Sequence, residues 1–546
     1  MKTLFRRRTD SIAPARKPVM LALAAIMLVA AALRAWHLDF GLPALNDPDE
    51  PIFILTSLDM LRGPTLNPGW FGHPATLLFY LLALVIVAVA GTGMAIGAWH
   101  GTGELVAAVF ANPAVVVLPM RALCAVFGLA SVWLTWRLGE RVGGTRLGLI
   151  AALLIAVNAL HVDLSQVIRT DMLATVLMTW SLIYALAIAR GGGRRDHVWA
   201  GIAAGLACAT KWPAILVLVA PLSAALAHRA QLRRELAIAP LVAIATLVIV
   251  SPYLLLDWHT VLRDLGGEAR PAHLGSTGHG MIANLGWYVA HPLARGIGWA
   301  GVALVAIGAV DMLRDRASAA TLLPFALAFL LALSAQALVW ERWFVPLLPV
   351  AMLLAARGIG AIADLPRDPR HRIAAAGVLS LALAGSMAAE AAQRLAYRGH
   401  DARQAATRWA LAHIPPGRTI LVESAAFDLL AYRGRILFPL GSDGCIDARG
   451  LLAGHPTQHG TNEKRTGKAI VDLGHIDAPR LGTCRADYFI LSNYGRYRHV
   501  AAAFPVEIAT YRAALRGSRR VFAAVQPDPA QRAEGRDVEI YRAAGS

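Results

Sequence analysis

The sequence predicts a polytopic α-helical membrane protein with about 11 transmembrane helices, followed by a C-terminal soluble α+β domain. Hydrophobic residues make up 57% of the 546 residues and charged residues only 16%, and the mean hydropathy is +0.52. Apolar runs recur from residue 19 to residue 390, and alternating polar and apolar residues replace them from residue 397 onward. Such a chain has too little polar surface to enclose a soluble globule.

The net charge of +17 does not indicate nucleic-acid binding. Many Lys and Arg residues lie in short loops between apolar runs, as in "RLGERVGGTR" at 137–146, "RGGGRRDH" at 190–197 and "RDPRHR" at 367–372. Short cytoplasmic loops of membrane proteins carry this excess of basic residues. We therefore place these loops on the inner side of the membrane.

The first apolar run, residues 19–33, follows six basic residues, which predict a cytoplasmic N-terminus. The first helix therefore runs outward. A cleaved signal peptide is the competing interpretation, because small residues follow the run. In either case the segment after Trp36 lies outside.

The apolar stretch 76–98 does not fit a simple alternation, because no basic residue follows it until Arg121. If 119–136 runs inward to the basic loop after it, then 76–98 is a re-entrant or juxtamembrane helix, or a miscounted span. The first outer loop then covers about 37–118.

The remaining spans alternate regularly and complete a membrane domain over residues 1–396. They are 147–160, 171–189, 198–210, 213–227, 236–256, 295–310, 319–339, 343–356 and 373–390, with a long outer loop at 257–294. The basic loops fall on the inner side in this assignment. The segment after residue 396 is therefore extracytoplasmic.

Residues 397–546 predict a soluble α+β domain large enough to fold alone. "DARQAATRWALAHIPPG" at 401–417 indicates a helix ended by Pro415 and Pro416, and "RTILVES" and "ADYFILS" indicate strands. Cys445 and Cys484 lie in this domain. They would form a disulfide in an oxidising compartment, and two free thiols are the alternative.

Ionisable residues gather at the predicted outer ends of the spans. "NDPDEPIFI" at 46–54 places Asp47, Asp49 and Glu50 just beyond the first span. Other outer ends carry Arg169, Asp171, Lys211, Glu341 and Arg342. Charges at membrane depth are costly and usually mark functional sites, although each cation alone could extend to the interface. Together they suit a pocket for an anionic head group such as a phosphate.

The order of several motifs resembles the family 39 glycosyltransferases of the membrane-embedded GT-C fold, which include protein O-mannosyltransferases and lipid A aminoarabinose transferases. These motifs are "PDE" at 48–50, "HPATLLFY" at 73–80, "RTD" at 169–171, "GLACATK" at 205–211, "ERWFVPLLP" at 341–349 and the helix at 401–417. The resemblance implies juxtamembrane helices in the first outer loop. It also implies a multi-pass enzyme of a bacterial-type inner membrane.

The resemblance further implies a sugar donor carried on polyprenyl phosphate and a hydroxyl acceptor on a protein, lipid or glycan. Asp49 matches the catalytic base of the family, and Glu50 beside it is a second candidate catalytic residue. We expect Arg169, Lys211 and Arg342 to bind the donor phosphate. His73 would contact this phosphate or serve as an anchor at the interface, and it occupies a position where the acceptor classes differ, so the acceptor stays open.

Asp171 either holds Arg169 in place or assists at the acceptor. No cofactor is expected, and a divalent cation is left open. His259, His273 and His279 in the loop 257–294 do not have the spacing of a metal site, so we expect this Gly-containing loop to form a mobile lid.

Two rival functions remain at this stage. A transporter or flippase of a lipid-linked sugar should carry ionisable groups near the midplane of broken, repeated helices, and the sequence shows no such repeat. An oligosaccharyltransferase-like GT-C enzyme should carry a Trp-Trp-Asp motif in its outer domain, and the sequence has none.

Overall fold

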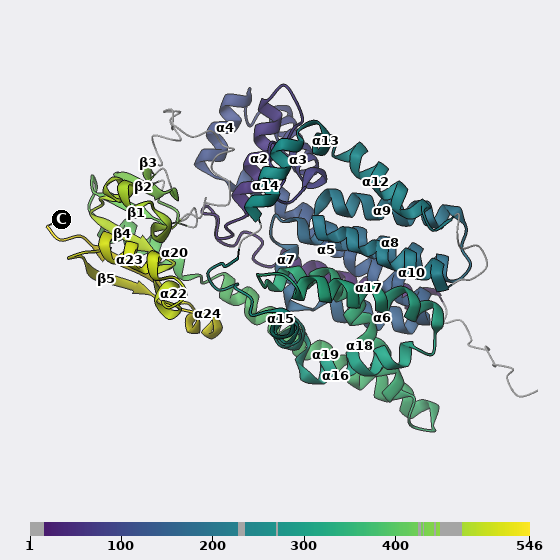
Figure 1. Cartoon of the computed structure of the whole chain (residues 1–546). Helices are drawn as coiled ribbons and strands as arrows, with labels where there is room; N and C mark the ends of the chain where they lie inside the picture. The colour runs from purple at the N-terminus through teal and green to yellow at the C-terminus, as the bar shows by residue number, and fades with distance from the viewer. Residues whose placement is uncertain are drawn as a thin grey trace, which may run out of the picture.

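The chain folds into a helical bundle and a smaller sheet domain at one end of it, as the computed structural model in Figure 1 shows. The structure describes residues 16–227, 235–268, 271–423, 427–429, 431–441, 444–447 and 472–545. The basic start of the chain and the loop at 228–234 lie outside the described residues.

The bundle extends from α1 to α19 and contains α-helices, two 3₁₀ helices (η1, η3) and one π-helix (η2). They are α1 Arg16–Ala35, α2 Glu50–Arg62, α3 Thr76–Ala95, α4 Thr102–Ala111, α5 Ala114–Gly143, α6 Thr145–Ala156, α7 Ala159–Ser165, α8 Thr170–Ala189, α9 Arg194–Thr210, η1 Trp212–Leu218, α10 Val219–Ala227, α12 Ile238–Val250, α13 Tyr253–Leu256, α14 Trp258–Glu268, α15 Met281–Tyr288, η2 Val289–Leu293, α16 Ala294–Met312, α17 Arg316–Ser334, η3 Glu341–Leu347, α18 Leu348–Ala363 and α19 Pro369–Arg398.

The membrane-spanning character predicted from the sequence is confirmed. Among the described residues, 8 helices are long and apolar enough to cross a membrane, or up to 9 if α6 and α7, bent by 66°, form one span. Trp212–Ala227 and Ile238–Val250 are shorter apolar helices. Each stretch that the sequence analysis assigned as a span falls mainly on helix.

The first loop after α1 contains α2, α3 and α4, which lie near the sheet domain in Figure 1. Helix α3 packs against α2, α5 and α9, and it is among the helices long enough to span. Its interpretation as a re-entrant or juxtamembrane helix therefore stays a prediction.

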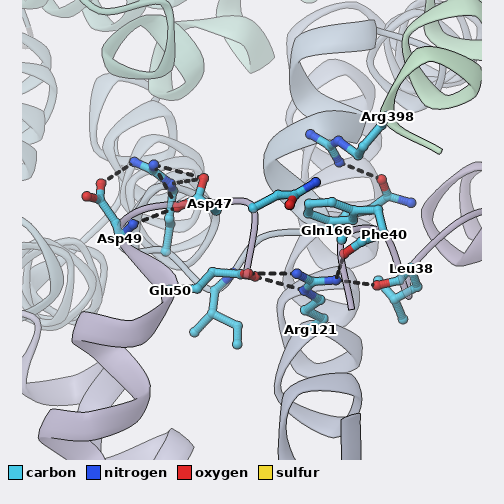
Figure 2. Close-up of polar contacts among 12 residues, drawn as sticks. Leu38, Phe40, Asp47, Asp49, Glu50, Arg121, Gln166 and Arg398 are labelled. Carbon is cyan, nitrogen blue, oxygen red and sulfur yellow. Dashed lines mark hydrogen bonds and ion pairs between the residues drawn. The ribbon is translucent and has the colours of Figure 1, made fainter. Parts of the chain in front are cut away.

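A buried ion pair fixes the start of α2 against α5. Arg121 of α5 donates from Nε to Glu50 Oε1 at 2.8 Å and from Nη2 to Glu50 Oε2 at 2.7 Å, and both side chains are fully buried. The remaining Nη1 of Arg121 donates to the carbonyls of Leu38 and Phe40, each at 2.8 Å. Figure 2 shows this pairing, with the Phe40 ring beside the guanidinium.

The C-terminal domain is built on a six-stranded mixed sheet of order β3-β2-β1-β4-β6-β5, in which β2, β1 and β4 are parallel. Its elements are α20 Ala402–His413, β1 Thr419–Val422, β2 Arg435–Pro439, β3 Cys445–Asp447, η6 Leu473–His475, η7 Ala478–Cys484, β4 Tyr488–Leu491, α22 Tyr494–His499, α23 Pro505–Ala514, β5 Arg519–Ala524, α24 Pro529–Ala533 and β6 Val538–Arg542. The predicted helix and both predicted strands are present, as α20, β1 and β4.

Helix α20 packs one side on the sheet. Ala402, Ala406 and Ala410 recur every four residues and are buried in the same core as Ile420 of β1 and Ile540 of β6. The boundary predicted at residue 396 falls in the last turn of α19, so a continuous helix leads directly to this domain.

Cys445 and Cys484 are joined by a disulfide, which decides between the two alternatives that the sequence left open. Cys124 and Cys208 are free and buried. Disulfides persist in oxidising compartments, and the extracytoplasmic placement of this domain stays a prediction.

We expect protein that is denatured without reductant to react with maleimide-polyethylene glycol at Cys124 and Cys208 only, and at all four cysteines after reduction. Gel shifts report the number of labelled thiols, and a Cys445→Ser variant should expose Cys484 without reduction. Four labelled thiols in unreduced protein would contradict the pairing.

We expect Arg121→Met to destabilise the folded protein by about 3–5 kcal/mol, because it leaves the Glu50 carboxylate buried without its partner. The thermal unfolding midpoint of purified protein in detergent measures this loss. Arg137→Met is the matched control on α5, since the Arg137–Glu140 pair is partly exposed and should contribute about 1 kcal/mol or less. Equal midpoints for the two variants would contradict the structural role of the buried pair.

Candidate active site

The predicted site residues come together at the end of the bundle that faces the sheet domain. Asp47 and Asp49 lie in the turn before α2, and Arg169 occupies the N-cap of α8. Lys211 occupies the C-cap of α9, and Arg342 lies in the first turn of η3. Helix ends and 3₁₀ turns leave these residues outside regular α-helix, where long side chains can converge.

Arg169 binds two carboxylates at once. Its Nε and Nη2 contact Asp47 Oδ2 and Oδ1 at 3.1 and 2.9 Å, and its Nη1 lies 2.6 Å from Asp49 Oδ2. The Asp49 amide also donates to Asp47 Oδ1 at 2.9 Å. Figure 2 shows both aspartates directed toward this guanidinium, so one arginine fixes the geometry of the turn.

Arg342 approaches Asp49 from another direction, with Nη1 at 3.7 Å from Oδ2. Its guanidinium carbon lies 4.2 Å from the centre of the Trp340 ring. Burial alone would raise the pKa of Asp49, but Arg169 and Arg342 outweigh burial and hold this pKa well below its usual range. Asp49 is therefore ionised at neutral pH.

Lys211 and Asp171 form a second ion pair in the site, between Nζ and Oδ1, and both side chains are almost fully buried. The direct partner of Asp171 is thus Lys211. Burial, with the nearby charges of Lys211 and Arg342, lowers the pKa of His73 to about 4. The imidazole is therefore neutral at pH 7, and its ring lies 5.6 Å from that of Trp70.

Glu50 is directed away from Asp49, although the two residues are adjacent in the chain. Its carboxylate accepts from Arg121 and from the backbone amide of Ile168 at 3.2 Å, directly before Arg169. The catalytic role predicted for Glu50 stays a prediction, and the observed contacts give this carboxylate a structural task.

A small, mostly apolar pocket lies beside Lys211 between the helices. Ala174 and Met178 of α8, Ala214 of η1 and Leu333 of α17 line it, and Trp343 follows Arg342 on its wall. Lys211 therefore borders a small apolar pocket within the bundle.

The loop at 257–294 contributes His273 to the edge of the site. The His273 ring meets the Trp340 ring edge-on, with 4.9 Å between the two ring centres. A bridge between Thr277 and Leu338 ties the loop to the segment before Arg342. Within the described parts of the chain, no group of three or more His, Cys, Asp or Glu residues could hold a metal ion.

Sequence reasoning did not identify Arg121 as the partner of Glu50, nor Asp47 as the bidentate partner of Arg169. Arg121 lies inside a predicted span, and a charge there was itself a signal of a buried partner. The choice of Glu50 as that partner required the tertiary structure.

A comparison with protein families matches residues 96–256 to the family described as dolichyl-phosphate-mannose-protein mannosyltransferase. A comparison with curated proteins finds no match. The family match covers the segment that contains Arg169, Asp171 and Lys211, and it confirms the predicted resemblance for this part of the chain.

Solved structures of two kinds have a similar fold. ArnT from Cupriavidus metallidurans bound to undecaprenyl phosphate has a TM-score of 0.53 and 13% identity, with 97% of this chain and 99% of that chain covered. The oligosaccharyltransferase AglB from Archaeoglobus fulgidus, in complex with an inhibitory peptide and a dolichol-phosphate, has a TM-score of 0.53 and 13% identity, with 96% and 74% covered. The chain therefore has the GT-C fold.

Proposed function

We propose that this protein is a membrane glycosyltransferase that moves a sugar from a polyprenyl-phosphate donor to a hydroxyl acceptor, with Asp49 as the base. The observation that carries the proposal is the Asp49 carboxylate, held between Arg169 and Arg342, in a site whose third cation, Lys211, borders a small apolar pocket. A lipid-linked sugar joins an apolar chain, an anionic phosphate and a reacting sugar. The apolar pocket, the cations and Asp49 would meet these three parts in turn.

The existing ion pairs indicate which cations would bind the donor phosphate. Arg169 is held on two sides by Asp47 and Asp49. Arg342 makes only a longer contact with Asp49, and its side chain is 19% exposed. Arg342 is therefore the leading phosphate ligand, Lys211 would join it by releasing Asp171, and Arg169 chiefly orients Asp49 while adding positive potential.

Phosphate binding would also activate the base. Two guanidinium groups lower the pKa of Asp49, which weakens the affinity of this carboxylate for a proton. A phosphate that draws Arg342 away removes one of these charges and raises this pKa toward the range of an effective base. Proton removal would thus be coupled to the presence of the donor.

In the reaction the acceptor oxygen attacks the anomeric carbon from the side opposite the phosphate. The bond between this carbon and the phosphate oxygen breaks, and polyprenyl phosphate leaves with the electron pair. Asp49 takes the acceptor proton, and Arg342 and Lys211 offset the charge on the departing phosphate. One displacement inverts the anomeric configuration.

The small apolar pocket next to Lys211 would have to widen to accept the first part of the polyprenyl chain. Neutral His73 can donate or accept a hydrogen bond beside the phosphate without adding charge. Asp171 holds Lys211, and its assistance at the acceptor remains the second assignment. We place the site on the extracytoplasmic side of a bacterial-type inner membrane.

The transporter alternative has less support. A transporter should concentrate its ionisable groups near the bilayer midplane. The charged residues assembled here lie at helix ends on one side of the bundle, where a lipid head group and a water-soluble acceptor can meet.

We expect Asp49→Asn to reduce sugar transfer by roughly 10²–10⁴-fold, because the amide cannot take the acceptor proton. Binding of undecaprenyl phosphate should be retained or strengthened, since a negative charge near the phosphate is removed. Transfer from radiolabelled polyprenyl-phosphate sugars in a membrane extract, and binding of undecaprenyl phosphate to purified protein, measure the two effects. Asp39→Asn in the same loop is the matched control, and full transfer by Asp49→Asn would exclude Asp49 as the base.

We expect Lys211→Met to weaken undecaprenyl phosphate binding by about 10–100-fold, because a charged hydrogen bond contributes roughly 1.5–3 kcal/mol. Methionine keeps the apolar stem of the side chain at the cavity. The affinity of the natural protein should fall as salt rises, and that of the variant should fall less. Unchanged affinity in Lys211→Met would remove Lys211 from the phosphate site.

A further inference from the structure

We propose that Arg403 and Gln404 of the C-terminal domain are positioning residues for the loop that carries Asp47 and Asp49, an inference that rests on the proposed role of Asp49. Arg403 Nη1 donates to the carbonyl oxygen of Asn46 at 2.7 Å. Gln404 Nε2 lies 3.1 Å from the carbonyl oxygen of Gly41 and 3.0 Å from Asn46 Oδ1.

The arginine is held ready for this contact by its own helix. Asp401 caps α20, accepting from the Arg403 amide at 2.8 Å. The same carboxylate binds Arg403 Nε and Nη2 at 2.8 and 2.7 Å. Two sides of the guanidinium are therefore fixed, and the planar group directs Nη1 at Asn46 with little loss of freedom.

These two side chains are not required for the core of their own domain. Helix α20 packs on the sheet through Ala402, Ala406 and Ala410, whereas Arg403 and Gln404 make their polar contacts to the first outer loop. The face of the helix that meets the bundle is thus a polar docking face.

The loop that receives these bonds has no helix or strand from residue 41 to residue 49. Its course depends on side-chain contacts, and Gly41, with φ of +74°, lies so close to Asn46 that a Cβ would come within 2.6 Å of its side chain. Asn46 precedes Asp47, and Asp47 holds Arg169, which in turn contacts Asp49. A shift of Asn46 would therefore move the proposed base.

The C-terminal domain also contacts the opposite edge of the site. Arg496 of α22 donates to the carbonyl oxygen of Leu274 at 3.0 Å. Leu274 follows His273, whose ring packs on Trp340, and Trp340 receives the Arg342 guanidinium. The domain therefore touches both the segment of the base and the segment that supports a proposed phosphate ligand.

The test compares Gln404→Leu and Arg403→Met with Arg408→Met, an exposed residue on the same helix, all in the full chain. We expect the first two to lower kcat for transfer from radiolabelled polyprenyl-phosphate sugars about tenfold. Their Kd for undecaprenyl phosphate should stay within about twofold of the natural protein, and Arg408→Met should change neither. Arg403→Lys should restore part of kcat, because lysine can still donate to Asn46.

A purely structural role would lower donor binding and thermal stability together with kcat, and this result would overturn the inference. An unchanged kcat in both Arg403→Met and Gln404→Leu would also overturn it. Combining Arg403→Met with Asp49→Asn separates the two proposals. If Arg403 acts through Asp49, the second change should add little to the first. Full activity of Asp49→Asn alone would instead refute the proposed base, whatever the Arg403 variants do.

Discussion

The bidentate pair between Glu50 and Arg121 is the interaction on which the site depends. Burying two charges is costly, and the cost is offset only when each charge meets a well-placed partner. Glu50 meets this condition with both oxygens on Arg121, and it also accepts from the amide of Ile168. This one carboxylate therefore joins the start of α2, the N-terminal part of α5 and the turn before Arg169.

The geometry of the neighbouring residues follows from that junction. Asp49 directly precedes Glu50, and Arg169 directly follows Ile168, so one anchor brings the two ends of an ion pair to 2.6 Å. The aspartates and cations then balance within the site, with Asp47, Asp49 and Asp171 facing Arg169, Arg342 and Lys211. An incoming phosphate must displace one of these contacts, and the longest of them is the contact between Arg342 and Asp49.

The sequence predicted the membrane helices, because these follow from apolar runs, and the orientation inferred from basic loops stays a prediction. It also identified Asp49, Arg169, Lys211 and Arg342 as members of one site, and the structure brings them together at one end of the bundle. It did not predict which charges pair. Glu50 and Arg121 are 71 residues apart, and Arg403 and Asn46 are 357 apart. Hydrophobic periodicity indicates which residues are buried. Which charged residues from distant segments pair with each other depends on how the helices cross.

Arg34, which interrupts the first apolar run, shows how a buried cation can be accommodated without a carboxylate. The Arg34 guanidinium donates to the carbonyl oxygen of Ala156 at 3.0 Å, at the last residue of α6, and it contacts His161 Nδ1 at 2.7 Å. The C-terminal end of a helix leaves carbonyl groups unpaired and carries partial negative charge. A cation there donates hydrogen bonds to the carbonyl groups and offsets the charge. The chain bends by 66° at this point into α7.

Helix α7 connects these Arg34 contacts to the active site. Gln166, at its C-cap, donates to the carbonyl oxygens of Arg34 and Trp36 and accepts from Arg398 of α19 at 2.8 Å. Figure 2 shows this contact beside Phe40, whose ring also lies 4.3 Å from the Arg398 guanidinium carbon. Arg169 lies only three residues after Gln166 in the chain. The position of Arg169 is therefore determined from two sides, by the Arg34 contacts through α7 and by Glu50 through Ile168. This explains how a guanidinium at a helix end can hold two aspartates in a fixed geometry.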